Sequence, residues 1–444
     1  MQSPELLSPA GTFKNMTYAF AYGADAVYAG QPRYSLRARN NDFSMENLRK
    51  GIDYAHGIGK RFFVASNVLP HNNKVRTYLR DMEPVVEMKP DALIMADPGL
   101  IMLVREKWPD QAIHLSVQAN TMNAASVKFW HSVGLTRVIL SRELGLEEIA
   151  EIKQQCPEME IEVFVHGSLC IAYSGRCLLS GYFNHRDPNQ GACTNACRWQ
   201  YGVTEGKTDD SGDARPLGSA FGNYTPQVAA HNDIDEQPVY LLEEKSRPGE
   251  FMPIEEDENG TYILNSKDLR AIQHVAQLAN IGVDSLKIEG RTKSHFYTAR
   301  TAQLYRRAIE DWATGQEFDM DLMRGLDGMA SRGYTEGFYR RHVPKDMQNY
   351  DDGGTQLGSQ RFAGEIDPSA DTNGMITVDV KNKIRVGDEL ELMLPNGSHR
   401  FTLQHMENEK GEAMDIAPGS GHRIRIPTPV EINQAGFGML MVCS

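Results

Sequence analysis

Four of the six cysteines lie close together in the middle of the chain and could bind a metal ion or an iron–sulfur cluster. They are Cys170, Cys177, Cys193 and Cys197, in the spacing C-x6-C-x15-C-x3-C, with Cys156 and Cys443 outside the group. Thiolates gathered in a long chain without an export signal are more often metal or cluster ligands than disulfides. Structural zinc usually takes two C-x2–4-C pairs, and only the last two cysteines have that spacing. A 4Fe-4S cluster with four thiolate ligands therefore fits at least as well as zinc, which stays the alternative.

The composition bounds the kind of protein that carries these cysteines. A chain of 444 residues with 41% hydrophobic residues is long enough for two or three domains. It contains no run of 18 uncharged apolar residues, and its first residues have no export-signal pattern, so we expect a cytoplasmic protein without a membrane partner. The net charge of −13 argues against a nucleic-acid partner, but residues 204–260 alone contain 14 acidic and 4 basic residues. The rest of the chain is close to neutral, which leaves room for a local basic face.

The first three quarters of the chain alternate short apolar runs with amphipathic stretches of helical period. Such alternation predicts a parallel sheet covered by helices. Eight β-type runs favour a (β/α)8 barrel, with an open doubly wound sheet as the alternative, and no G-x-G-x-x-G follows any of the runs. The expected strands are Glu5–Leu7, Ala26–Tyr28, Arg61–Ala65, Ala92–Met95, Ile113–Val117, Arg137–Leu140, Ile161–Val165 and Ser285–Ile288.

The cysteine group interrupts this alternation. We expect a barrel over residues 1–330, with a cysteine-rich and acidic insertion at about 168–262 that follows the seventh strand. The acidic part, 204–260, is expected to lie on the surface and to be partly mobile. Insertions after barrel strands lie on the face that carries the active site, so the cysteines should lie beside the barrel mouth. A linker at 331–359 and a small antiparallel β-barrel at 360–444 complete the predicted organisation.

Polar residues at the ends of the expected strands are candidates for the site. Glu289 and Arg291 end the eighth strand and are candidate catalytic residues, with a structural Glu–Arg pair as the alternative. Lys287 has the same strand parity as Glu289 and could pair with it inside the barrel. Candidate substrate-binding residues are Arg142, Gln118, Asn120 and Lys287.

Two further groups have weaker support. His166 follows the seventh strand beside Cys170 and is the third candidate catalytic residue, although it lacks the spacing of a serine–histidine peptidase site and could be structural. Arg33 begins a loop in which arginines alternate with Tyr34 and Phe43. Such a loop could bind phosphates and stack a base, or it could be an ordinary surface loop.

The segment Glu162–Ser180 matches a long signature, E-x-F-x2-G-S-L-C-x4-G-x-C-x-L-S. This segment resembles a collagenase-like peptidase family of unassigned catalytic type. Further landmarks of that family occur at Glu5–Gly11, Asn265–Leu269 and Ser285–Arg291, so the resemblance covers essentially the whole chain.

Within that family, the stretches Cys177–Gly191, Cys193–Trp199 and Gly290–Lys293 resemble a branch that modifies tRNA. The resemblance implies prephenate-dependent conversion of a wobble uridine to 5-hydroxyuridine by an iron–sulfur protein. It implies tRNA and prephenate as partners and leaves room for a protein electron donor. Some relatives carry a cysteine where this chain has Arg270, so the fourth cluster ligand must come from elsewhere, and Cys197 is the nearest candidate. A peptidase acting on protein substrates and a non-catalytic tRNA- or prephenate-binding partner of another enzyme are the alternative functions.

Overall fold

The computed structural model describes most of the barrel and of the C-terminal domain. The described residues are 3–35, 42–168, 267–329, 333–340, 360–367, 374–428, 430 and 435–443, together with the backbone of the strands at 201–208, 214–216, 239–244, 251–257 and 260–263. Among these residues, no helix is long and apolar enough to cross a membrane.

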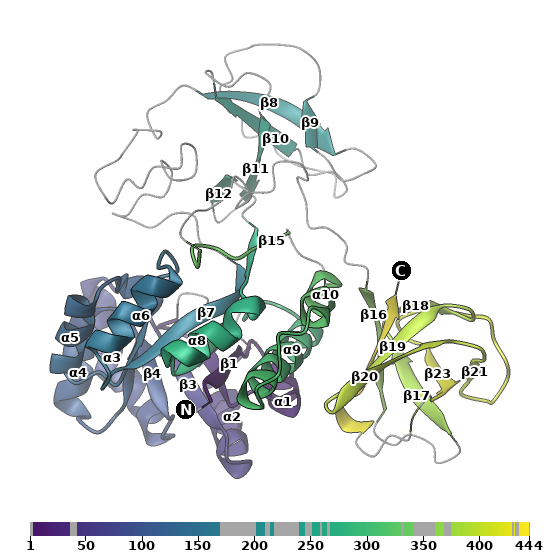
Figure 1. Cartoon of the computed structure of the whole chain (residues 1–444), viewed down its shortest axis with the longest axis horizontal. Helices are drawn as coiled ribbons and strands as arrows, with labels where there is room; N and C mark the ends of the chain where they lie inside the picture. Colours follow the sequence, from purple (N-terminus) through teal and green to yellow (C-terminus); the bar gives the residue numbers. More distant parts are fainter. Residues whose placement is uncertain are drawn as a thin grey trace.

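Eight parallel strands form a closed barrel (Figure 1). Each strand pairs with the next along the chain, and the pairing of the last strand with both the first and the seventh closes the ring. The predicted (β/α)8 fold is therefore confirmed. The barrel strands are β1 (Glu5–Pro9), β2 (Ala26–Gly30), β3 (Arg61–Ser66), β4 (Ala92–Met95), β5 (Ile113–Leu115), β6 (Arg137–Ile139), β7 (Glu160–Ser168) and β14 (Ser285–Ile288).

Helices surround the barrel, and five of the described ones begin at a residue whose side chain caps the first turn. The side chains of Thr12, Ser44, Asp97, Asn123 and Ser294 each accept a hydrogen bond from a backbone N–H of the first turn. Such bonds satisfy donors that a helix leaves open at its start. The helices are α1 (Phe13–Ala21), α2 (Met45–Gly57), α3 (Asn72–Glu87), α4 (Pro98–Lys107), α5 (Ala124–Ser132), α6 (Leu146–Gln155), α8 (Val275–Ile281), α9 (His295–Ala313) and α10 (Asp321–Asp327).

Six of the eight barrel strands differ at their ends from the sequence-based expectation, and for two of them the structure shows the cause. The fifth strand stops at Leu115 because the Ser116 side chain accepts a bond from the Gln118 backbone N–H and starts a 3-10 turn, η2 (Val117–Ala119). The seventh strand continues to Ser168 because β13 (Asp268–Arg270) pairs antiparallel with its end and in turn pairs with β15 (Tyr334–Thr335). The pairing partner lies about 100 residues away in the sequence, so the local pattern could not predict this extension.

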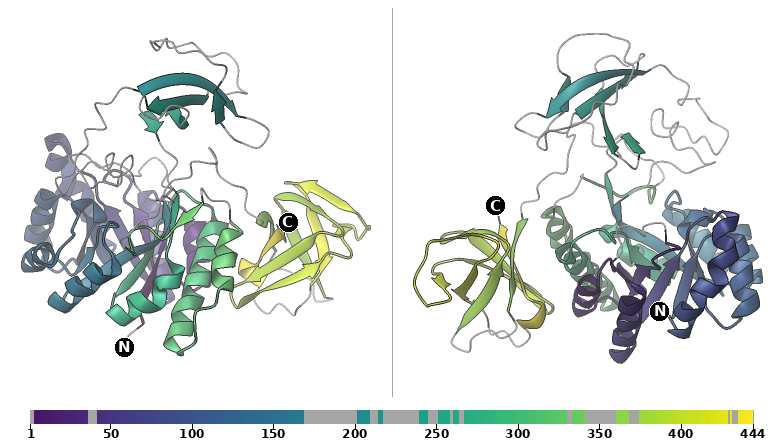
Figure 2. Two further views of the ribbon diagram at one scale, coloured as in Figure 1. Left: turned by 45° about the horizontal axis from the view of Figure 1, so that its top comes forward. Right: turned by 180° about the vertical axis from the view of Figure 1, so that it is seen from behind.

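Parts of the acidic stretch form strands. A five-stranded antiparallel sheet, drawn apart from the barrel and the C-terminal domain in Figures 1 and 2, has the order β12-β11-β10-β8-β9. Its strands are β8 (Tyr201–Thr208), β9 (Ala214–Pro216), β10 (Val239–Glu244), β11 (Phe251–Asp257) and β12 (Gly260–Ile263).

The C-terminal residues form the expected antiparallel β domain around a core of its own. Seven strands pair in the order β20-β19-β24-β16-β17-β23-β21, and β18 pairs with β22. The strands are β16 (Gln360–Ile366), β17 (Met375–Val380), β18 (Asn382–Arg385), β19 (Glu389–Leu394), β20 (Gly397–Thr402), β21 (Glu407–Asn408), β22 (Ile416–Gly419), β23 (Arg423–Pro427) and β24 (Met439–Cys443).

The C-terminal domain packs against α1 and α9 through a buried ion pair. Arg300 of α9 donates to Glu391 of β19 over 2.5 Å, and both side chains are at most 4% exposed. Gln360 donates to the other carboxylate oxygen over 2.6 Å. The Tyr22 hydroxyl at the end of α1 donates to the backbone oxygens of Met393 (3.1 Å) and Phe437 (2.8 Å). These buried contacts fix the domain to the flank of the barrel.

Replacing Glu391 with glutamine should loosen this attachment. The change keeps the shape of the side chain and leaves the Arg300 guanidinium buried without its counter-charge, a situation that costs about 3–5 kcal/mol. We expect a lower denaturant midpoint and faster proteolysis between the domains. The control Glu83→Gln removes an exposed pair with Lys107, so it should leave both measurements close to wild type. Equal effects of the two substitutions would contradict the assigned role of the Arg300–Glu391 pair.

Candidate active site

Charged side chains fill the middle of the barrel. Arg137 of β6 donates through Nη1 to Glu5 of β1 (2.6 Å) and to Glu162 of β7 (3.0 Å). The other oxygen of Glu162 accepts from Nζ of Lys287 on β14 over 2.7 Å. These four side chains are at most 3% exposed. Barrel interiors are usually packed with branched apolar residues, so a buried chain of charges marks this barrel as a candidate site.

The charges in this chain depend on one another. Burial by itself would raise the pKa of Glu162, but the cations of Lys287 and Arg137 outweigh burial and hold that pKa below its usual value. Burial lowers the pKa of Lys287, and the carboxylate of Glu162 opposes the shift. Burial together with the nearby cations of Arg137, Lys287 and Arg61 lowers the pKa of His114, so this β5 histidine is neutral at pH 7.

Three cations and two aromatic rings alternate toward the barrel mouth. Lys287 Nζ lies 4.2 Å from the centre of the Tyr28 ring and 5.6 Å from that of Phe164. The same two rings also contact two arginines: Arg291 lies 5.7 Å from the centre of Tyr28, and Arg142 lies 3.9 Å from that of Phe164. Aromatic faces attract cations, so the two rings help to hold the three positive groups near one another. We call these five residues the cation–aromatic row.

Glu289 and Arg291 lie at the rim, as the strand-end rule predicted. The Tyr28 hydroxyl donates to Glu289 over 3.1 Å, and Arg291 Nη1 donates to Ser35 Oγ over 2.8 Å. Gly30 makes room for the guanidinium, because a Cβ at this position would lie 2.8 Å from Arg291 Nη1. Both rim residues are less than 10% exposed. Lys287 donates its hydrogen bond to Glu162, and the nearby carboxylate of Glu289 also opposes the lowering of the Lys287 pKa.

The other predicted substrate-binding residues follow β5 and β6. Arg142 is half-buried and donates to the backbone oxygen of Ser168 over 2.7 Å, which ties the end of β6 to the end of β7. Gln118 lies in η2, and Asn120 ends that turn in the left-handed conformation, with φ 50°. Asn120 also donates to the Gln118 backbone oxygen over 3.2 Å. The structure thus places Arg142 in the cation–aromatic row and the two amides at the end of a neighbouring strand.

His166 lies on the outer side of β7, toward α9. Its ring is within 6 Å of the rings of Tyr297, Tyr305 and Tyr334, and its Nδ1 lies 3.4 Å from the Tyr305 hydroxyl. Burial, with smaller contributions from Arg270 and Lys293, lowers its pKa to about 3. These neighbours differ from those of Lys287 and Glu162, and a catalytic role for His166 stays a prediction.

The four clustered cysteines lie outside the described residues. The described part of β7 ends at Ser168, two residues before Cys170. Within the described residues there is no group of three or more His, Cys, Asp or Glu side chains that could hold a metal ion. Cys156 and Cys443 are free thiols. The cysteine ligand set therefore stays a prediction, as does the choice between iron–sulfur and zinc.

Sequence reasoning missed several members of the buried chain. Glu5, Arg137, Glu162 and His114 were not predicted as site residues. A usable signal existed for His114 and Glu162, because each is a polar residue between apolar neighbours within its strand, whereas Glu5 and Arg137 are the first residues of β1 and β6. The proposed base-stacking role of Tyr34 and Phe43 is wrong, because both rings are at most 1% exposed and cannot face a nucleotide.

Comparison with known proteins gives consistent matches. Residues 11–349 match the family model described as Peptidase family U32, and residues 358–437 match Peptidase family U32 C-terminal domain. The chain is 60% identical to the Escherichia coli protein named tRNA hydroxylation protein P, over 99% of this chain and 97% of that one. Proteins of the same name from Haemophilus influenzae (57% identity, 99% and 96% coverage) and Helicobacter pylori (36%, 79% and 75%) also match.

A double-mutant cycle on Lys287 and Glu162 tests the buried chain. Lys287→Met and Glu162→Gln should each lower the free energy of unfolding by about 3–5 kcal/mol, because each leaves a buried charge without its partner. The double substitution should cost clearly less than the sum, since it removes both charges. Denaturant unfolding of the four proteins measures this. Strict additivity would show that the two charges do not depend on each other.

The low pKa of His166 predicts a pH dependence of stability. The unfolded histidine titrates near 6.5 and the folded one near 3, so between these values only the unfolded state binds the proton. The stability contribution is complete above pH 6.5 and is lost as the pH falls toward 3, by up to about 1.4 kcal/mol per pH unit. His166→Phe should reduce the slope of unfolding free energy between pH 6 and about pH 5 relative to wild type. Tyr305→Phe, which keeps the histidine, should retain the slope. An unchanged slope in His166→Phe would contradict the burial argument.

Proposed function

Because the chain belongs to the peptidase U32 family, we propose that it is a tRNA-modifying enzyme that converts a wobble uridine to 5-hydroxyuridine with prephenate as co-substrate. The observation that carries this proposal is the 60% identity, over nearly the full length of both chains, to a protein named for tRNA hydroxylation. The identity extends through both the barrel and the C-terminal domain. A similarity confined to the barrel would have supported the fold alone.

The cation–aromatic row supports binding of an anionic co-substrate at the mouth. Prephenate carries two carboxylates, and a guanidinium can bind a carboxylate through two parallel hydrogen bonds. Arg291 and Arg142 are anchored from opposite sides of the row, by Ser35 and by the backbone of Ser168. We propose that they hold the carboxylates, with Lys287 adding positive charge from below.

The remaining rim residues are suited to placing the nucleotide. A base inside a folded tRNA must leave its stack to reach a barrel mouth, and a flipped base is usually recognised through hydrogen bonds to its polar edge. Gln118 and Asn120 offer both donors and acceptors for such bonds. We propose that Glu289, which accepts a hydrogen bond from the Tyr28 hydroxyl, accepts or returns a proton at the rim.

The oxidation itself needs a redox group, because no natural side chain hydroxylates a pyrimidine carbon unaided. We propose that Cys170, Cys177, Cys193 and Cys197 hold a 4Fe-4S cluster. This donor set has only soft thiolates, which suits iron–sulfur clusters and also zinc. When bound, the cluster would supply electron transfer. The end of β7, two residues before Cys170, supports a position for the first ligand near the barrel mouth.

No described feature favours the peptidase alternative. A serine or cysteine peptidase needs a nucleophile in hydrogen-bond reach of a histidine that an acid orients. The described neighbours of the His166 ring are tyrosines. A non-catalytic partner role would be excluded if the purified chain, tRNA, prephenate and an electron source sufficed for the reaction.

Mass spectrometry of wobble nucleosides tests the proposal. A strain that lacks this protein should lose 5-hydroxyuridine and regain it when the wild-type chain is supplied. Arg291→Met should restore less than about a tenth of it, because loss of one well-placed charged contact costs 10²-fold or more in rate. Lys128→Met, an exposed change on α5, should restore it fully. Normal 5-hydroxyuridine in the deletion strain would refute the function.

A further inference from the structure

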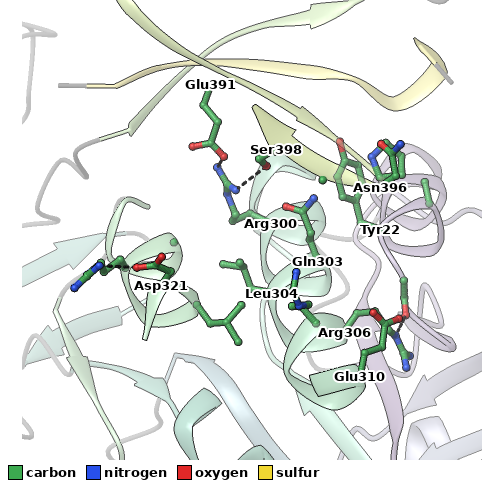
Figure 3. A pocket seen from close by; sticks show the side chains of 18 of the residues that line it. Tyr22, Arg300, Gln303, Leu304, Arg306, Glu310, Asp321, Glu391, Asn396 and Ser398 are labelled. Atoms are coloured by element: carbon green, nitrogen blue, oxygen red, sulfur yellow. Dashed lines mark hydrogen bonds and ion pairs between the residues drawn. The ribbon is translucent and has the colours of Figure 1, made fainter. Parts of the chain in front are cut away.

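A polar cavity lies away from the barrel mouth, between the barrel and the C-terminal domain. It has a volume of about 1100 Å³ and is bounded by α1, α9 and α10 on one side and by the β19–β20 hairpin on the other. Figure 3 shows Arg300 of α9 directed toward Glu391 and Ser398 of the hairpin, to which it is hydrogen-bonded, with Gln303 and Asn396 also lining the space. We call it the interdomain cleft.

The interdomain cleft lies toward the end of the barrel opposite the mouth. Its wall includes Asp25 and Lys60, which immediately precede β2 and β3. The mouth is formed by the other ends of these strands, where Gly30 and Ser66 lie. The cleft is therefore a separate surface from the site that contains Arg291 and Lys287.

The lining of the cleft is more basic than the chain as a whole. Six cationic side chains line it, namely Lys60, Arg300, Arg306, Arg307, Arg324 and Arg400, against the four carboxylates of Asp25, Glu310, Asp321 and Glu391. The whole chain, in contrast, has a net charge of −13. A local excess of cations in an acidic protein indicates an anionic partner.

Three of these arginines can bind a ligand without breaking the domain contact. Arg307, Arg324 and Arg400 have side chains that are 58%, 78% and 69% exposed. Arg324 pairs with Asp321, which is 71% exposed, and Arg400 lies 3.7 Å from Glu391, at the edge of ion-pair distance. Arg307 donates through Nε to the buried Asp311 over 2.7 Å. The exposed pair of Arg324 contributes little to stability, so a phosphate can compete with it.

The size and lining of the cleft fit an extended polyanion better than a small ligand. Small-molecule sites usually have about 300–1,000 Å³ and mainly apolar walls. This cleft is at the upper limit of that range and has charged and amide-bearing walls, with Asn396 and Ser398 exposed. An RNA backbone offers repeated phosphates for arginines and 2′-hydroxyls for amides and hydroxyls.

We propose that the interdomain cleft binds the phosphate backbone of the tRNA while its anticodon loop is at the barrel mouth. This inference rests on the proposed function, since it takes tRNA as the substrate. A folded tRNA extends well beyond a barrel mouth, so a second contact on the flank adds affinity and sets orientation. The buried Arg300–Glu391 pair holds the two walls at a fixed separation, so the exposed arginines are positioned before the RNA binds.

The test is the salt dependence of tRNA binding by the full-length chain. The variant Arg307→Gln/Arg324→Gln/Arg400→Gln is compared with Arg49→Gln/Arg76→Gln/Arg385→Gln, which removes three exposed arginines outside the cleft and so changes the net charge equally. The cleft variant should bind tRNA roughly tenfold or more weakly at low salt. Its slope of log affinity against log salt should be shallower by about 2–3, since each lost phosphate contact removes about 0.7–0.9. It should also raise KM for tRNA more than it lowers kcat.

Equal affinity and slope in the two triple variants, or no measurable tRNA binding by the wild-type chain, would overturn the proposal. The outcome for the proposed function is read separately, from wobble nucleosides. Binding that depends on the cleft without any hydroxylation would refute the function and support the cleft. Hydroxylation of the wobble uridine together with equal tRNA binding by the two triple variants would support the function and refute the role of the cleft.

Discussion

The carboxylate of Glu162, buried between Lys287 and Arg137, is the interaction on which the barrel interior depends. It joins three strands, β6, β7 and β14, by two hydrogen-bonded ion pairs at 2.7 and 3.0 Å. Each charge is acceptable in the interior only because its partners are present, since an isolated buried charge would cost several kcal/mol. The polar interior thus depends on the eight strands meeting in one register, and a barrel that closed in another register would leave these charges unpaired.

The positive groups near the barrel mouth are held in place by this buried interior. Lys287 binds Glu162 on one side and lies between the rings of Tyr28 and Phe164, which also contact Arg291 and Arg142. The positive groups are thereby held close together in surroundings that screen charge less than water does. An anion that enters the mouth meets charges already in place, which reduces the cost of organising the site when the ligand binds.

Helix α9 connects the mouth with the C-terminal domain. Near its start, the Tyr297 hydroxyl donates to the Glu289 backbone oxygen over 2.7 Å, next to the rim. One turn later, Arg300 makes the buried pair with Glu391, and Gln303 donates to the Leu394 backbone oxygen over 2.9 Å. A single helix therefore contacts the rim, the interdomain cleft and the second domain. This continuity gives the two proposed tRNA contacts a fixed relative position.

The sequence by itself determined the (β/α)8 class and the antiparallel C-terminal domain, because both depend on local periodicity and turn residues. It also indicated Glu289 and Arg291 as candidate site residues, because the end of the apolar run that forms the eighth strand can be read from the sequence. Only the tertiary structure decided that Lys287 bonds to Glu162, that β7 extends to Ser168, and that the Tyr34 ring is buried. Each of these depends on residues from distant segments that meet when the barrel closes, and no local pattern specifies which distant side chain a buried charge will face.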